Sequence, residues 1–326
     1  MLIKDRVYGE IEITEQVLIE LINSKPVQRL KGINQHGNSR LSLYPEPISR
    51  YEHSVGVMIL LRLLGAPLEE QIAGLLHDVP HTAFSHVIDS VYKSKDQDFH
   101  EKFHKKIVIN SEIPEILKKH NFEVDRVIDE HNFPLLENSA PNICADRIDY
   151  TLRDYTLVMN SNFRTFEIFK AMIVKDNEII FNDKQQAKNF TDIYVWMGKS
   201  FWANINDVAR YQILANAIQI ALDNDIITES DLFHDDAWVY GKLVNSGNEE
   251  ILKNLNLLNQ DFECVHDPED YVFHSFAKFR YVDPKIFLES ETKRVSELFP
   301  EMKNVFDEER VKVEAGYYIK IIPQDS

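Results

Sequence analysis

The chain contains 326 residues, of which 44% are hydrophobic and 11% aromatic, a composition that supports a substantial core and excludes an intrinsically disordered protein. Its 10 glycines and 12 prolines are too few for a loop-rich, all-β fold. The formal net charge of −17 argues against a general nucleic-acid-binding surface, although a local cluster of basic residues can still bind a small anion.

The amino-terminal segment predicts a short β-hairpin in a soluble protein. The first residues, MLIKDRVYGEIEIT, carry charges where a signal peptide needs an apolar run, so we expect no secretion signal. Apolar and polar residues alternate in RVYGEIEIT around Gly9, a pattern typical of a hairpin. The two cysteines, Cys144 and Cys264, cannot form a disulfide framework and suit a reducing compartment. We therefore expect a cytoplasmic location.

Helical patterns follow the hairpin. Thr14 is a candidate cap for a helix whose apolar face is formed by Val17, Leu18, Leu21 and Ile22. Residues 55–64 are apolar almost all round, which predicts a buried helix. The longer apolar stretch, residues 55–68, is too short and too interrupted to span a membrane. Pro67 fits the first turn of the next helix, and Pro80 predicts that this helix ends near the dipeptide His77-Asp78.

The second half of the chain mixes helices with short strands. Residues 173–181, IVKDNEIIF, predict a strand, a turn and a second strand. Residues 183–222 have a helical pattern rich in aromatic side chains, and the alternation in residues 311–322 predicts a strand. We expect a mainly α fold with small β-hairpin appendages. Residues 1–225 would form the core, and residues 226–326 would form an α+β region packed on the same domain.

Six of the 12 histidines lie between positions 53 and 104, and the setting of two of them predicts a metal site. His53 precedes one predicted buried helix, and His77-Asp78 ends the next, so two packed helices can bring these side chains together. Asp146 is flanked by apolar residues in ICADRIDYTLRDY. A buried carboxylate there needs a partner, which is either a metal ion or, as an alternative, an arginine.

These residues form a mixed ligand set of imidazole nitrogens and carboxylate oxygens: His53, His77, Asp78 and Asp146. Such a set suits one divalent transition metal, namely Mn, Fe, Ni, Zn or Co, and excludes a thiolate site. A metal held there would keep positive charge for a phosphate oxygen and would lower the pKa of a bound water.

Further histidines lie close by in the sequence. His81 and His86 follow the turn after the proline, and His100 and His104 are four positions apart. These histidines are candidates for phosphate contacts and proton transfer, because the pKa of histidine lies near neutrality. Glu101 is placed beside His100 and can orient it. For His104 we favour a solvated residue on a helix surface.

The dipeptide His-Asp also occurs at two positions where we predict no metal. His234-Asp235 lies in SDLFHDDAW, where Asp231, Asp235 and Asp236 have the character of acids at helix N-termini. His266-Asp267 precedes a proline and predicts a turn.

The ordered series His53, His77-Asp78 and Asp146 resembles the H…HD…D motif of the HD-domain phosphohydrolases. The similarity is greatest to the deoxynucleoside triphosphate triphosphohydrolase, or dGTPase-like, branch. The similar segments cover most of residues 1 to about 225 and read QRLKGINQHG, SRYEHSVGV, LLHDVPHTAFSH, FHEK, ADRIDYTLRDY and RYQ. An HD dipeptide alone is a weak signal, whereas this ordered series is specific. The resemblance implies an HD-domain helical fold, a metal-dependent phosphohydrolase and a homo-oligomer.

The resemblance also implies roles for individual residues. The metal ligands would be His53, His77, Asp78 and Asp146. The phosphate contacts would be Arg50, His81, His86 and Arg147. The proton donor would be His100, with Glu101 beside it. The sugar and base contacts would be Gln35, Tyr150, Asp154, Tyr211 and Gln212. One catalytic transition metal is implied, and Mg²⁺ accompanying the substrate is a further option.

Two positions depart from the family pattern. Pro80 stands where the family usually has glycine, and His36 stands where a family leucine helps to exclude a ribose 2′-hydroxyl. The choice between deoxyribose and ribose is therefore open. The chain is also shorter than many enzymes of the branch, so their allosteric nucleotide sites cannot be transferred to it.

Three functions follow from these observations. The leading hypothesis is a metal-dependent dNTP triphosphohydrolase that releases a deoxynucleoside and triphosphate. The second is an HD-type phosphatase or phosphodiesterase acting on mononucleotides or other phosphate esters. The third is a non-catalytic nucleotide-sensing protein, which is disfavoured because all four ligand positions are intact. We expect no membrane partner and no general nucleic-acid binding.

Overall fold

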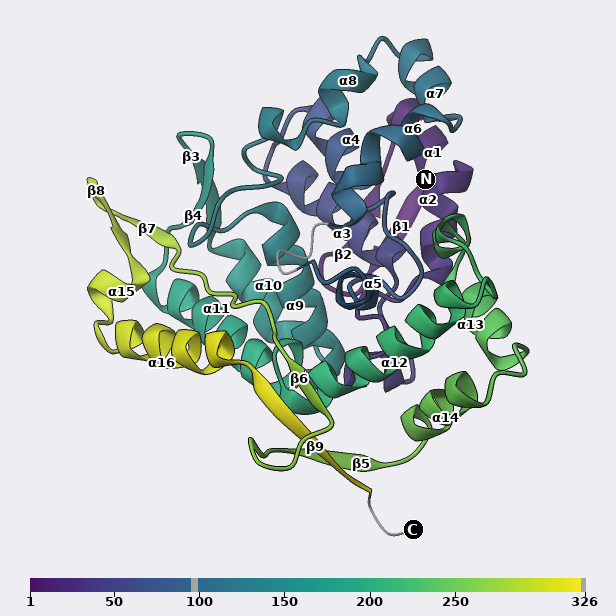
Figure 1. Cartoon of the computed structure of the whole chain (residues 1–326). Helices are drawn as coiled ribbons and strands as arrows, with labels where there is room; N and C mark the ends of the chain where they lie inside the picture. Colours follow the sequence, from purple (N-terminus) through teal and green to yellow (C-terminus); the bar gives the residue numbers. More distant parts are fainter. Residues whose placement is uncertain (95–98, 324–326) are drawn as a thin grey trace.

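The computed structural model describes residues 1–94 and 99–323, and it confirms a mainly helical fold with small sheets (Figure 1). The longer helices are α3 (Arg50–Leu63), α4 (Leu68–Leu76), α9 (Ala145–Met159), α11 (Lys184–Met197), α12 (Ile205–Asp223) and α16 (Glu301–Ala315). The shorter α-helices are α1 (Gln16–Ile22), α2 (Lys25–Arg29), α5 (Val87–Val91), α6 (His104–Ile109), α7 (Ile113–Lys119), α8 (Val124–Val127), α10 (Phe163–Lys170), α13 (Asp236–Val244), α14 (Glu249–Leu258) and α15 (Val295–Leu298). Short turns of other helical types are η1 (Leu30–Gly32), η2 (Arg40–Leu43), η3 (His100–Phe103), η4 (Glu130–Asn132), η5 (Gly198–Trp202) and η6 (Glu229–Phe233). Within the described ranges, no helix combines the length and the apolar character needed to cross a membrane.

The described strands form three small sheets, and both predicted hairpins are confirmed. The first sheet pairs β1 (Leu2–Asp5) with β2 (Gly9–Glu12). The second has the order β3 (Met172–Lys175), β4 (Glu178–Phe181), β7 (Lys285–Leu288) and β8 (Glu291–Arg294). The third has the order β5 (Phe262–His266), β9 (Tyr317–Pro323) and β6 (Phe273–Ser275). The parallel pairing of Phe181 with Ile286 joins the middle of the chain to its C-terminal region.

The two largest clusters of buried apolar side chains among the described residues hold the helices together. The larger cluster runs from Val7 to Phe306 and includes side chains of α3, α4, α9, α11 and α16. The other cluster joins the segment after Pro80 to α12, α13 and α14. Both clusters contain residues from each side of position 225, so the C-terminal region shares its packing with the rest of the chain.

Helix α3 packs against both α4 and α9 in the interior. The Ser49 side chain caps its N-terminus by accepting a hydrogen bond from the Glu52 backbone N–H at 3.1 Å. Gly56 allows the close approach of α9, because a Cβ atom there would lie 1.9 Å from Arg153 Nη2. The following helix, α4, ends at Leu76, as the position of Pro80 predicts, although Pro67 lies just before its first turn rather than within it.

The structure corrects the start of the first helix and the start of the last strand. Glu15, rather than Thr14, occupies the N-cap position of α1. Residues 311–315, predicted to begin a strand, instead continue α16. Val313 is buried with Met302 and Phe306, whose spacing along the chain matches a helical face rather than a strand. Gly316, with a φ angle of 73°, ends α16 before β9 begins.

The two other His-Asp pairs lie in the local settings that the sequence predicts. Asp235 caps α13 by accepting a hydrogen bond from the Trp238 backbone N–H at 2.8 Å. Asp231 forms a capping box at η6. His266 ends β5, and the Asp267 carboxylate accepts backbone hydrogen bonds in the turn that follows.

His104 is buried, which contradicts the prediction of a solvated residue. Only 9% of it is exposed, and its Nε2 atom has no hydrogen-bond partner among the described residues. The reason is tertiary, because the short helix α6 directs this side chain against the end of α4, where it bonds to the backbone of Leu76. Burial, together with the positive charge of His77, lowers the pKa of His104 to about 4.

A histidine that is buried in its neutral form makes folding depend on pH. The unfolded chain takes up a proton as the pH falls below about 6.5, whereas the folded protein does so only near pH 4, so stability is lost across this window. We expect His104→Asn to reduce the loss in free energy of unfolding between pH 7 and pH 4.5 by about 2 kcal/mol. Urea denaturation at both pH values measures this difference.

The matched control is His131→Asn, which replaces an exposed histidine in a neighbouring segment. This variant should keep the pH dependence of the unmodified protein. An equal pH dependence in His104→Asn and the unmodified protein would contradict the assigned effect of burial.

Candidate active site

Three helix ends meet at the predicted ligand residues. His53 lies in the first turn of α3, His77 follows the last turn of α4, and Asp146 lies in the first turn of α9. One ligand atom of each of these three residues lies within 4.8 Å of the others. Asp78 completes the group, with its Oδ1 atom 3.5 Å from His77 Nε2 and its Oδ2 atom 3.8 Å from His53 Nε2. The fold therefore brings all four side chains together.

This group carries an excess of negative charge. His53 Nε2 lies 2.9 Å from Asp146 Oδ1, and His77 Nε2 lies 3.6 Å from the same oxygen. Burial alone would raise the pKa of Asp146, but the hydrogen bond to His53 and the nearby positive charges of His53 and His77 hold it well below its usual range. Burial would likewise lower the pKa of His77, yet the carboxylates of Asp78 and Asp146 raise it to about 10. The site therefore favours a bound cation.

Hydrogen bonds at Nδ1 fix the orientation of both histidine rings. His53 Nδ1 donates to Asp149 Oδ2 at 2.8 Å, and His77 Nδ1 donates to the Gly74 carbonyl at 2.7 Å. The Nε2 atom of each ring therefore faces the shared centre. His77 Nε2 is buried and makes no hydrogen bond within the described part of the chain. Metal-binding histidines in proteins show this arrangement, so the donor set fits a divalent metal.

Asp149 in turn depends on Arg153, which sequence reasoning missed. Arg153 is fully buried and donates to both Asp149 oxygens, at 2.8 and 2.9 Å. It also donates to Glu52 and to Asp5 of the N-terminal hairpin, each at 2.9 Å. The spacing of ADRIDYTLRDY could have revealed part of this network, because Asp149 and Arg153 are four positions apart on one helix.

Arg50 and three histidines form a basic cluster next to the candidate ligands. Arg50 donates to Asp78 Oδ2 at 2.9 Å and to Ser85 Oγ at 3.0 Å. The rings of His81 and His100 stack with centroids 3.7 Å apart, and His86 lies edge-on to both.

Burial keeps these three imidazoles neutral when no substrate is bound. It lowers the pKa of His100 to about 3, and the neighbouring His86 and Arg50 lower it further. Burial and the charge of Arg50 also lower the pKa values of His81 and His86.

The turn after Pro80 that holds this cluster is fixed from a distant helix. Phe84 and Ser85 have φ angles of 60° and 51°, in the left-handed region. The Asp236 carboxylate, at the start of α13, accepts hydrogen bonds from the Phe84 N–H at 2.7 Å and from the Asn34 N–H at 2.9 Å. Asp236 therefore joins the histidine turn to the segment that carries Gln35, a residue of the cavity described next.

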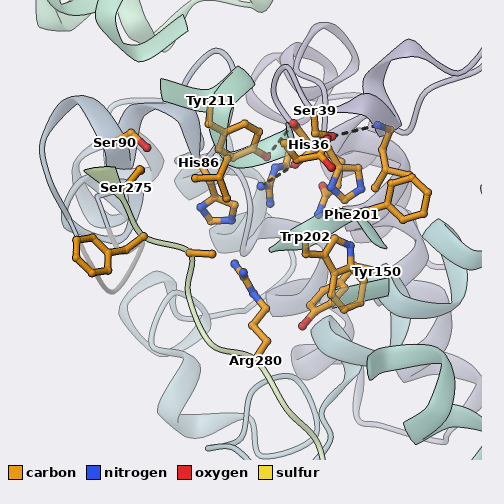
Figure 2. A pocket seen from close by; sticks show the side chains of 17 residues that line it. His36, Ser39, His86, Ser90, Tyr150, Phe201, Trp202, Tyr211, Ser275 and Arg280 are labelled. Atoms are coloured by element: carbon orange, nitrogen blue, oxygen red, sulfur yellow. Dashed lines mark hydrogen bonds between the residues drawn. The ribbon is translucent and has the colours of Figure 1, made fainter. Parts of the chain in front are cut away.

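A cavity opens beside this cluster (Figure 2). Its wall combines cationic and aromatic side chains, among them Arg50, His86, Tyr150, Phe201, Trp202, Tyr211 and Arg280. Of the predicted sugar and base residues, Gln35, Tyr150 and Tyr211 line the cavity. A lining of cationic and aromatic side chains suits a ligand that carries both phosphates and a base.

Asp154 and Gln212 contact the lining residues from outside. Asp154 is fully buried, and its two oxygens accept hydrogen bonds from His36 Nε2 at 2.7 Å and Trp202 Nε1 at 2.8 Å. Gln212 contacts Asn216 and Ser275. Asp154 therefore fixes the orientation of two cavity walls.

The structure places Arg147 and Glu101 away from this cavity. Arg147 donates to Glu137 Oε1 at 2.8 Å and to the Asn142 carbonyl at 3.1 Å, so its guanidinium is bound to the preceding loop. Glu101 is exposed and borders a separate surface hollow that also contains His104. Proximity in sequence to Asp146 and to His100 therefore does not bring these two side chains to the cavity wall.

Sequence reasoning missed much of the cavity wall, including Phe201, Trp202 and Arg280. Phe201 and Trp202 follow α11 in the short π-helical turn η5, within the aromatic-rich segment that the sequence marked only as helical. Arg280 lies in the C-terminal region, where the segment KFRYVDP resembles the family only loosely and gave no role to any of its residues. These residues belong to the cavity only because distant segments pack together.

Known proteins are similar to this chain in sequence and in fold. An HD-domain family model matches residues 50–154, which contain all four candidate ligands. The chain is 40% identical to the uncharacterized protein YdhJ of Bacillus subtilis, over 99% of this chain and 100% of that protein. A crystal structure of a hypothetical protein from Aquifex aeolicus covers 95% of this chain and 99% of its own, with a TM-score of 0.69 and 20% identity. This likeness shows a shared fold.

Two relatives with named activities extend the comparison. A stretch covering 28% of this chain and 17% of its relative is 34% identical to the deoxynucleoside triphosphate triphosphohydrolase SAMHD1 of Danio rerio. The metal-dependent phosphohydrolase cns2 of Cordyceps militaris is 32% identical, over 89% of this chain and 86% of that protein. The chain therefore belongs to the HD-domain metal-dependent phosphohydrolases and is an enzyme of that family.

Proposed function

We propose that this enzyme hydrolyses nucleotides, and that it converts a dNTP into a deoxynucleoside and triphosphate. The observation that carries the proposal is that the candidate metal ligands, the basic cluster and the aromatic cavity wall lie next to one another. The candidate ligands contact Arg50 through Asp78, Arg50 and His86 also line the cavity, and aromatic rings form the opposite wall. The resemblance to the dGTPase-like branch and the partial identity to SAMHD1 support the choice of a dNTP.

His53, His77, Asp78 and Asp146 would hold one divalent transition metal: Mn, Fe, Ni, Zn or Co. When bound, such a metal polarises a phosphate oxygen and lowers the pKa of a coordinated water. The carboxylates supply the negative charge that a cation needs, and the buried Nε2 of His77 would supply a lone pair once the cation had displaced its proton. Asp149 and Gly74 keep both imidazole rings in place for this role.

The basic cluster would bind the phosphates and transfer a proton. Arg50, His81 and His86 would offset the negative charge of the phosphates, in a buried setting where such contacts are strong. His100 would give a proton to the leaving oxygen. Its pKa is low without substrate, so it would carry that proton only when the phosphate charge offsets burial and the charge of Arg50.

The aromatic part of the cavity would hold the nucleoside. Tyr150, Trp202 and Tyr211 offer flat apolar surfaces against which a base can stack. Gln35 carries a buried Oε1 atom without a hydrogen-bond partner among the described residues, so it is available to a donor group on the ligand.

The alternative function is a phosphatase or phosphodiesterase that acts on mononucleotides or other phosphate esters. One observation favours keeping it. His36 presents a polar ring to the cavity, and Asp154 and the Tyr211 hydroxyl, which donates to the His36 carbonyl at 2.8 Å, hold it in place. A polar wall at this point suits a ligand that carries an extra hydroxyl group. The homo-oligomer implied by the resemblance stays a prediction.

The metal site is tested by removing one ligand. We expect His77→Ala to lower metal-dependent hydrolysis more than about 100-fold and to lower the bound metal per protein, because the remaining ligands coordinate incompletely. Enzyme assays and elemental analysis of the purified protein measure these effects, and circular dichroism checks that the variant is folded.

A second His-Asp pair supplies the matched control. His234→Ala removes the same side chain from the pair at the start of α13, where the ring stacks on Trp238 with centroids 4.0 Å apart. It should retain metal and activity. Activity like that of the unmodified enzyme in His77→Ala would sink the proposed mechanism.

The substrate is tested by identifying the products. The enzyme is incubated with dNTPs, NTPs and the corresponding monophosphates, in the presence of each candidate metal. We expect dNTPs to give a deoxynucleoside and inorganic triphosphate, which phosphorus NMR distinguishes from orthophosphate. Orthophosphate released from monophosphates, with no triphosphate from any dNTP, would instead establish the alternative function.

A further inference from the structure

A segment of the C-terminal region forms one side of the cavity. Ser275, Phe276, Ala277 and Arg280 all line it, although the sequence gave none of them a role in the site. Figure 2 shows the Arg280 side chain extending into the cavity, with its guanidinium between His86 and Tyr150.

The charge of Arg280 acts on the same groups as the charge of Arg50. Burial lowers the pKa of His86, and Arg50 and Arg280 both lower it further. Burial raises the pKa of Tyr211, and both arginines oppose that rise. The two guanidinium groups therefore flank one space. Arg50 is also paired with Asp78, so Arg280 brings a second guanidinium to this cavity in a chain with a net charge of −17, which favours an anionic ligand.

The carboxylate of Asp207 does not cancel this positive charge. Asp207 lines the cavity, but its Oδ2 atom accepts hydrogen bonds from Arg40 Nη2 at 2.6 Å and Arg40 Nε at 3.0 Å. Its Oδ1 atom accepts from the Arg40 backbone N–H at 2.7 Å. Asp207 is therefore already neutralised by a partner outside the pair formed by Arg50 and Arg280.

Packing against α16 and its C-terminal end holds the backbone around Arg280 in place. The Tyr281 ring packs against Phe306 with centroids 5.4 Å apart, and the Arg310 guanidinium lies over the Phe279 ring at 5.5 Å. At the other end of the segment, a Cβ atom at Gly316 would lie 2.8 Å from the Phe276 ring, so only glycine permits this contact. Arg280 is therefore presented from an ordered support, which reduces the entropy lost on binding.

We propose that Arg280, on the wall of the cavity formed by the C-terminal region, binds a phosphate group of the substrate and so makes this region part of the active site. This inference rests on the proposed function. A guanidinium suits the role because its planar array of donors matches the geometry of phosphate oxygens. A nucleotide in the cavity would then be held by the aromatic walls at its base and by Arg50 and Arg280 at its phosphates.

Steady-state kinetics of Arg280→Gln and Arg280→Lys test the inference with the nucleotide that the enzyme hydrolyses. We expect Arg280→Gln to lower kcat/KM about 10-fold to 100-fold, because a charge-assisted contact to phosphate is lost. Arg280→Lys keeps the charge but not the planar array, so it should recover part of this loss. Thermal melting of each variant confirms that it is folded.

Lys278→Gln is the matched control, because it removes the same charge from the same segment at an exposed position outside the lining of this cavity. We expect its kcat/KM to stay within about twofold of the unmodified enzyme. An unchanged kcat/KM in Arg280→Gln, or an equal loss in Lys278→Gln, would overturn the inference.

Calorimetric titration with inorganic triphosphate separates this inference from the proposed function. We expect Arg280→Gln, loaded with metal, to bind triphosphate about 10-fold more weakly than the unmodified enzyme and Lys278→Gln. If no nucleotide is hydrolysed but this selective weakening is seen, the proposed function fails and the role of Arg280 stands. If nucleotides are hydrolysed and all three proteins bind triphosphate equally, the role of Arg280 is wrong while the function remains.

Discussion

The candidate site depends on the compensation of buried carboxylates by buried arginines. Arg153, which is fully buried, holds Asp149, and Arg50 holds Asp78. Without these partners, burial would favour the protonated carboxylic acids, because an isolated charge is costly away from water. The arginines thus allow several carboxylates to stay ionised in a small volume. That negative charge is what attracts protons, or a metal ion, to the centre beside His53.

The same network controls the direction of the imidazoles. Asp149 accepts the Nδ1 proton of His53, and the Gly74 carbonyl accepts that of His77, so both Nε2 atoms turn inward. Arg153 extends this support to Asp5 in the N-terminal hairpin, far from the site in sequence. The hairpin is therefore connected to the candidate metal ligands by a continuous chain of charged hydrogen bonds, although it contributes none of the ligands itself.

The cavity is built differently from the candidate metal site, because its walls come from segments that are distant in sequence and adjacent only in the folded protein. Asp236 in α13 holds the turn after Pro80 next to the segment before α3. Asp154 in α9 holds His36 and Trp202, which lie on separate segments. Side chains from α16 support the segment that carries Arg280. Long-range polar contacts and aromatic packing thus shape the cavity, while the candidate ligands are placed by three neighbouring helix ends.

Several features could be predicted from the sequence because their causes are local. Hydrophobic periodicity and the position of Pro80 predicted α3 and α4, and alternation around a turn predicted both hairpins. The prediction for the C-terminal tail was wrong in residues 311–315, where burial against Phe306 decides in favour of a helix.

The sequence by itself determined the family, and it also determined which residue types lie at the ends of α3 and α4 and at the start of α9. Only the tertiary structure decided that His104 is buried, that Arg147 is bound to a loop and that Arg280 reaches the cavity. The physical reason is that helix spacing and turns arise from neighbours in the chain. Burial and electrostatic environment instead arise from groups that are distant in sequence and close only after folding.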